Sequence, residues 1–124
     1  MYLEINGERP ISEIQKDFST VYPFLKLEFF RNGHSRRDRY PLHKLIPQTI
    51  QLKDAWYWKK DNGWLEVSDA MSVTEFESAL MDEFGLSAQV FRRSGNLWLE
   101  TTMTDNWSLK QQNEHGREIS THIY

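Results

Sequence analysis

Glutamate side chains are the groups of this chain best suited to chemistry. Several carboxylates on one face of a sheet could bind a divalent cation or act as an acid and a base. Strand alternation predicts such a face with four members: Glu4, Glu28, Glu66 and Glu100. Because strand surfaces often carry glutamate, an enzyme that relies on these clustered glutamates is only the third of three functional hypotheses.

The other usual signatures of catalysis or cofactor binding are missing from the sequence. The chain has no cysteine, which excludes a thiolate nucleophile, a disulfide framework and a cysteine-based zinc site. The four histidines form no short pair at metal-ligand spacing, and the six glycines form no phosphate-binding loop. We therefore expect no cofactor and no metal, and we favour a non-enzymatic function.

A basic loop gives the strongest charge signal. Residues 31–44 hold five basic residues and one acidic residue, although the net charge of the chain is −3. Cations beside aromatic rings are typical of surfaces that bind single-stranded nucleic acid. The candidate nucleic-acid-binding residues are Arg36, Arg37, Arg39, Trp56 and Trp58. A single-stranded nucleic-acid-binding domain is the alternative hypothesis, although the overall acidity disfavours phosphate binding.

An internal repeat organises the elements that would position these residues. Aligning the chain with itself at an offset of 62 residues matches residues 2–33 with residues 64–95 without a gap. In each copy an alternating strand pattern is followed by apolar residues at helical spacing. The helical positions are Ile11, Ile14, Phe18 and Tyr22 in the first copy and Val73, Phe76, Leu80 and Phe84 in the second. Pro23 and Gly85, at one aligned position, end the two helices.

Both predicted helices begin with sequences that fit a capping box. The fitting pairs are Ser12 with Gln15, Thr74 with Glu77 and, as a competitor, Ser72 with Glu75. The strands that follow the helices, 24–30 and 87–93, differ in the parity of their apolar residues. A bulge or a one-residue change of register is therefore expected between these strands.

The two strand–helix–strand units predict an α+β fold, a two-layer sandwich of ferredoxin-like duplicated βαβ units. A turn at residues 94–96 leads into an added hairpin strand over 97–102, and a C-terminal helix is expected at about 107–118. The basic loop, about 34–53, separates the two units, and a further strand is expected at 54–60. At 124 residues the chain has the size of a single domain.

Four aromatic rings lead to the preferred functional hypothesis. Alternation places Tyr2, Phe30, Trp64 and Trp98 on the sheet face opposite the helices, where they should form one patch. Because monomers rarely expose large apolar patches, something should cover these rings. The candidates are the 54–60 strand and the C-terminal helix, a second copy in a homodimer, or another protein. We therefore favour a small protein-interaction module that binds a protein partner or itself through this aromatic sheet face.

The N-terminal sequence bears on the compartment. Its first ten residues lack the basic and apolar regions of a signal peptide, and no apolar stretch in the chain approaches 18 residues. We therefore expect a cytoplasmic protein with no membrane partner.

Overall fold

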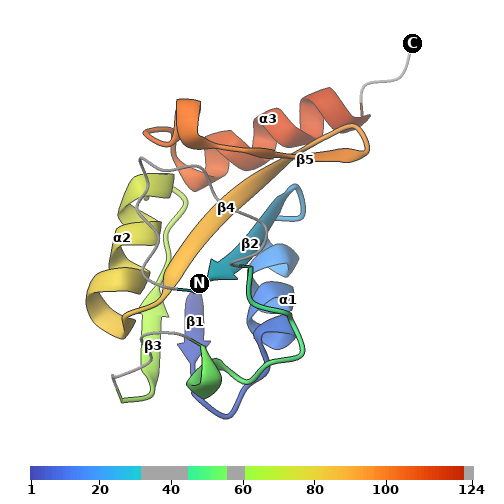
Figure 1. The fold of residues 1–124 in the computed structure, drawn as a ribbon. Helices are drawn as coiled ribbons and strands as arrows, with labels where there is room; N and C mark the ends of the chain where they lie inside the picture. The colour runs from blue at the N-terminus through green and yellow to red at the C-terminus, as the bar shows by residue number, and fades with distance from the viewer. Residues whose placement is uncertain (32–44, 56–60, 122–124) are drawn as a thin grey trace.

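The structure, a computed structural model, describes residues 1–31, 45–55 and 61–121. Its strands and helices follow in the order β1 (Tyr2–Ile5), α1 (Ile11–Val21), β2 (Leu25–Phe30), β3 (Gly63–Glu66), α2 (Val73–Phe84), β4 (Ser87–Ser94), β5 (Leu97–Glu100) and α3 (Leu109–Thr121) (Figure 1). Two short 3-10 helices, Leu52–Asp54 and Thr102–Thr104, lie in the connections. The predicted α+β class is confirmed.

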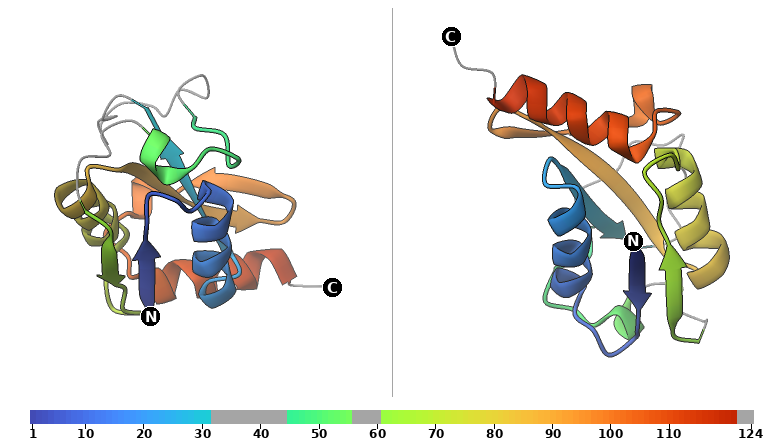
Figure 2. Two further views of the ribbon diagram at one scale, coloured as in Figure 1. Left: turned by 90° about the horizontal axis from the view of Figure 1, so that it is seen from below. Right: turned by 180° about the vertical axis from the view of Figure 1, so that it is seen from behind.

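The strands form two antiparallel sheets instead of one. β1 pairs with β3, and a second sheet has the order β2–β4–β5. A ferredoxin-like sandwich would join the four strands of the two units in a single sheet with both helices on one face. Here α1 lies beside β1 and α2 beside β3, at the two opposite edges of the β1–β3 sheet (Figures 1 and 2). The predicted ferredoxin-like duplication is therefore not confirmed.

Helix side chains occupy backbone groups at strand edges of the larger sheet. The Gln15 side chain of α1 donates a hydrogen bond to the carbonyl of Leu27 (2.7 Å), and Glu77 of α2 accepts one from the backbone N–H of Val90 (2.8 Å). These backbone groups lie on the edges of β2 and β4 that face away from each other. In a single sheet, β1 and β3 would need those same groups for their own ladder bonds.

The same two side chains correct the prediction of the helix starts. Gln15 and Glu77 occupy aligned positions, but neither belongs to a capping box. In α2 the capping box is formed by Ser72 and Glu75. The position aligned with Ser72 is Pro10, which precedes α1 without a side-chain cap because proline has no side-chain oxygen.

The strand registers carry a one-residue difference between the two units. Leu3 lies opposite Leu65, its aligned equivalent, whereas Leu27 lies opposite Val90, one residue beyond its aligned equivalent Gln89. This agrees with the expected change of register. The connections before these strands cannot follow the same path, because Gly85 has a φ of +67° and the aligned Pro23 is restricted to negative φ.

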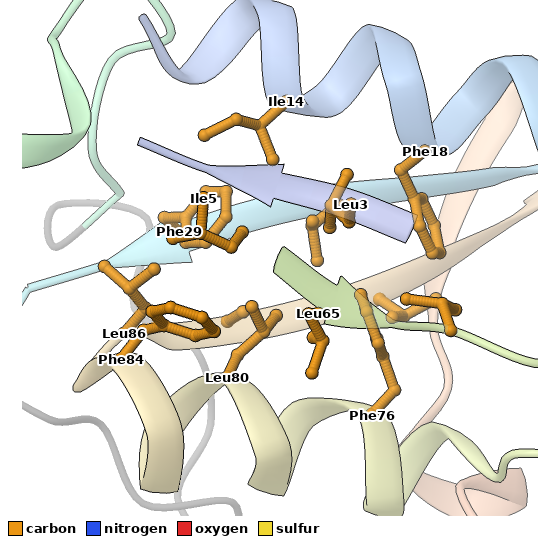
Figure 3. Packing of buried hydrophobic residues seen from close by; sticks show 14 of the residues in the cluster. Leu3, Ile5, Ile14, Phe18, Phe29, Leu65, Phe76, Leu80, Phe84 and Leu86 are labelled. Atoms are coloured by element: carbon orange, nitrogen blue, oxygen red, sulfur yellow. The ribbon is translucent and has the colours of Figure 1, made fainter. Parts of the chain in front are cut away.

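The hydrophobic core fills the space enclosed by the two sheets and the helices α1 and α2 (Figure 3). The inward residues of β1 and β3, Leu3 and Leu65, meet the helix residues Phe18 and Phe76 there. Phe18 and Phe76 stack, with ring centroids 5.1 Å apart and an interplanar angle of 12°. All four side chains are buried in the same cluster as Leu27 of β2 and Val90 of β4, so the core ties both sheets to both helices.

The last helix covers the far end of the larger sheet. α3 packs on β4 and β2. It lies at the end of the molecule opposite to the end where β1 finishes and β3 begins (Figures 1 and 2). The expected helix at about 107–118 is found at 109–121, continuing through Gly116. A Cβ on Gly116 would lie 3.0 Å from the Cβ of Phe24, so glycine permits the close packing of α3.

Replacing Phe76 tests the shared core. Phe76→Ala should lower the free energy of unfolding by about 3–5 kcal/mol, because it removes a buried ring and leaves a cavity against Phe18. Denaturant unfolding followed by circular dichroism measures the loss. Met103→Ala, at a side chain 94% exposed, is the control and should change stability by less than about 0.5 kcal/mol. Equal effects of the two changes would contradict the packing described here.

The loss of stability at high pH tests a hydrogen bond that joins the end of α1 to the β3–α2 connection. The Tyr22 hydroxyl donates to Asp69 (2.8 Å); burial, this bond and the Asp69 charge raise the pKa of Tyr22. The unfolded phenol loses its proton near pH ~10 while the folded one keeps it, so stability should fall as pH rises above about 10. The decrease in the free energy of unfolding at high pH should be smaller in Tyr22→Phe than in the wild type. The control Tyr2→Phe, which changes an exposed ring, should show the same decrease as the wild type. If the free energy of unfolding depends on pH in the same way in the wild type and in Tyr22→Phe, the hydrogen bond to Asp69 does not keep the Tyr22 phenol protonated in the folded state.

Candidate functional site

The structure divides the four predicted rings between the two sheets. Tyr2 and Trp64 lie on the outer face of the β1–β3 sheet and are 65% and 62% exposed. Phe30 and Trp98 belong to the three-stranded sheet, where Phe30 is 1% exposed and Trp98 38% exposed. The expected single patch of four rings is therefore not formed, because β1 and β3 do not share a sheet with β2 and β5.

Phe30 and Trp98 line a cavity of about 190 Å³ on the three-stranded sheet, together with Lys26, Glu28, Leu45 and Phe91. Leu45 forms an isolated β-bridge with Phe30, and the N–H of Ile46 donates to the carbonyl of Phe29 (2.9 Å). The segment beginning at Leu45 thus covers the end of β2. Phe30 is buried by the chain itself, so it is not available to a partner.

A lysine is held between a carboxylate and a ring at this cavity. The ammonium of Lys26 lies 3.0 Å from a carboxylate oxygen of Glu28 and 5.7 Å from the ring centroid of Trp98. The ring face attracts the cation, and the carboxylate neutralises it. This arrangement was not predicted from the sequence, although Lys26, Glu28 and Phe30 share one strand face by simple alternation.

The outer face of the β1–β3 sheet carries a different arrangement, in which rings and carboxylates alternate. Tyr2 lies opposite Glu66, and Glu4 lies opposite Trp64. Met1 and Val67 exchange backbone hydrogen bonds of 2.8 Å, so the next pair along, Tyr2 and Glu66, is a non-hydrogen-bonded pair, as is Glu4 with Trp64. Side chains come closest in such pairs. We call Tyr2, Glu4, Trp64 and Glu66 the outer face.

The fold holds this outer face firmly in place. Leu3, Ile5 and Leu65 alternate with the outer residues and are buried in the core, which fixes the register of the two strands. Arg9 donates to the carbonyl of Glu4 (2.9 Å) and pairs with Asp17 of α1 (2.8 Å). The short ribbon is thereby tied to α1 at its edge as well as through the core.

The predicted cluster of four glutamates does not exist. Glu4 and Glu66 lie on the two-stranded sheet, whereas Glu28 and Glu100 lie on the outer strands of the three-stranded sheet with β4 between them. Within 1–31, 45–55 and 61–121, no group of three or more histidine, aspartate or glutamate side chains could hold a metal ion. The geometry on which the enzyme hypothesis depended is thus absent from this part of the chain.

The candidate nucleic-acid-binding residues lie outside the described residues. They are Arg36, Arg37, Arg39, Trp56 and Trp58, and the alternative hypothesis stays a prediction. Of the four histidines only His115 is described; it lies in α3 with its ring edge-on to Trp107, 5.4 Å between centroids.

Arg92 is a half-buried cation that the sequence did not point to. Its guanidinium donates to Gln112 of α3 (2.9 Å) and lies 6.0 Å from the ring centroid of Trp107. Burial lowers the pKa of Arg92. These contacts join β4 to α3, so we assign Arg92 a structural role.

Comparison of the chain with protein-family models, with curated proteins and with solved structures found no match. Among the helices that the structure describes, none has the length and apolar character needed to cross a membrane.

The different burial of two predicted rings gives a stability test. Trp64→Lys should change the free energy of unfolding by about 0.5 kcal/mol or less, because the ring is mostly exposed. Phe30→Ala should cost about 3–5 kcal/mol, because its ring is buried. Urea unfolding measures both. A large loss of stability in Trp64→Lys would mean that the ring serves the fold and not a partner.

Proposed function

We propose that this protein is an interaction module that binds another protein through the outer face of its β1–β3 sheet. The observation that carries the proposal is the exposure of Tyr2 and Trp64, both above 60%, on neighbouring strands of a regular sheet. Tyrosine and tryptophan are enriched among the residues that contribute most to protein interfaces.

The rigidity of the outer face supports this function. The strands that carry it are anchored by buried residues, so its rings lose little backbone freedom when a partner binds. Low ordering cost leaves more of the contact energy available as affinity. Each ring also has a polar group, the hydroxyl of Tyr2 or the indole N–H of Trp64. Such rings suit a surface that is solvated in the free protein and loses its water when a partner binds.

The two units are also proposed to be structural duplicates of the βαβ type. At the offset of 62 residues, the bounds of β1, α1 and β2 agree with those of β3, α2 and β4 to within one or two residues. The matching roles of Gln15 and Glu77 at strand edges support the same view.

A random peptide library displayed on phage tests the proposed function, because it offers the protein many candidate partner sequences at once. Wild-type protein should enrich peptides that no longer bind Trp64→Lys or Tyr2→Ala. The matched control is Trp98→Lys, which changes a ring on the other sheet and should leave these peptides bound. Light scattering of the wild type tests the self-binding form, a homodimer.

Two results would contradict the proposed function. One is a library that yields only peptides indifferent to Trp64 and Tyr2. The other is a stable dimer that remains intact in Trp64→Lys, because its interface would then lie elsewhere.

A further inference from the structure

We infer that the partner segment is an extended strand rich in lysine or arginine, paired with the edge of β3 that faces away from β1, its cationic side chains lying on the outer face. This inference rests on the proposed function and adds the chemistry of the partner.

The charge of the outer face selects a cation. Glu4 and Glu66 form no ion pair with any residue that the structure describes, unlike Glu28 at the cavity. Residues 61–69, which contain β3, hold three acidic residues and no basic one. A basic segment would therefore meet complementary charge, which favours both specificity and rapid association.

Each ring on this face lies close enough to a carboxylate for both to contact the same cation. Side chains directly opposite in an antiparallel pair have Cβ atoms about 4.5–5.5 Å apart, so a lysine over Trp64 lies within reach of Glu4. The same relation joins Tyr2 and Glu66. The two pairs thus offer two sites for cationic side chains, each with a ring and a carboxylate.

The protein already uses this combination on its other sheet. Lys26 sits between the carboxylate of Glu28 and the ring of Trp98. On the outer face the carboxylate and the ring are both present, but no described lysine or arginine forms an ion pair with Glu4 or Glu66. Arg9 reaches only the backbone carbonyl of Glu4 and pairs with Asp17. A partner side chain would supply the third component.

The backbone of β3 favours an extended partner. Because Tyr2–Glu66 and Glu4–Trp64 are non-hydrogen-bonded pairs, the N–H and C=O groups of Trp64 and Glu66 point away from β1. No hydrogen bond from the described residues reaches these groups. On β2, in contrast, the outward carbonyls of Leu25, Leu27 and Phe29 are taken by Ser19, Gln15 and Ile46. An added strand would satisfy the β3 edge by β-augmentation.

The pairing predicts a sequence pattern in the partner. Residues of the added strand opposite Trp64 and Glu66 would project onto the outer face, two residues apart. Basic residues at every second position would therefore be recognised. A second copy would bring the same two glutamates and no cation on its own outer face, and a nucleic-acid backbone would be repelled by these glutamates.

A synthetic peptide with lysine at alternate positions, separated by valine and threonine, is the probe. Its binding to the full chain is measured by fluorescence anisotropy or calorimetry. Two comparison peptides have the same composition with clustered lysines, or glutamate in place of lysine. The alternating peptide should bind best, the glutamate peptide should not bind, and added salt should weaken binding.

Variants locate the binding. Trp64→Leu, and separately Glu4→Gln with Glu66→Gln, should each weaken binding by about two- to thirtyfold, the range expected from cation–π and exposed ionic contacts. Trp98→Leu and Glu100→Gln are the matched controls on the other sheet and should leave the affinity unchanged. Circular dichroism confirms that each variant is folded.

Backbone pairing is tested with two peptides N-methylated on alternate amides. One of them should lose binding and the other should keep it, because only alternate N–H groups face β3. Equal binding of the alternating and clustered peptides, unchanged affinity in Trp64→Leu, or insensitivity to methylation would overturn the inference. If the peptide library instead yields Trp64-dependent peptides without basic residues, the proposed function stands and this inference is wrong.

Discussion

Hydrogen bonds from two helix side chains occupy backbone groups at the strand edges of the larger sheet. A buried backbone N–H or C=O without a partner costs about 1–3 kcal/mol, so the edges of β2 and β4 need partners inside the molecule. Gln15 and Glu77 supply them at Leu27 and Val90, two residues that lie directly opposite each other. With these groups occupied, β1 and β3 form a separate two-stranded sheet on the other side of the core.

That arrangement leaves the two sheets with different surroundings. The helices α1 and α2 flank the core between the sheets (Figure 3), so neither is available to cover the outer side of the β1–β3 sheet. The comparable side of the larger sheet receives Leu45, which lies over Phe30 at the cavity. The exposure of Tyr2 and Trp64 is thus a consequence of the architecture, and their rigid position follows from the buried residues that alternate with them.

The two sheets also share a chemical theme. Lys26, Glu28 and Trp98 form a complete group of cation, carboxylate and ring within the chain. On the outer face, Glu4 with Trp64 and Glu66 with Tyr2 supply the carboxylate and the ring, and no lysine or arginine among residues 1–31, 45–55 and 61–121 forms an ion pair with these glutamates. This comparison, together with an edge of β3 to which no described residue bonds, is why a basic extended segment suits this surface better than a second copy or a nucleic acid.

Local patterns in the sequence were enough to predict the helices and strands of the two units and the inward or outward direction of most of their strand residues. The periodic positions from Ile11 to Tyr22 and from Val73 to Phe84 predicted both helices, because helix periodicity is a local property of the chain. Alternation likewise placed Tyr2, Glu4, Trp64 and Glu66 on one face correctly. The pairing of the strands could not be predicted from these local patterns, so it took the folded structure to show that Phe30 and Trp98 lie on a different sheet from Tyr2 and Trp64. Strand pairing is not a local property, because it depends on which strand edges are free once the helices have packed. The backbone groups of Leu27 and Val90 are occupied by the side chains of Gln15 and Glu77. The sequence around Gln15 and Glu77 also fits a capping box, so these contacts could not be predicted from it.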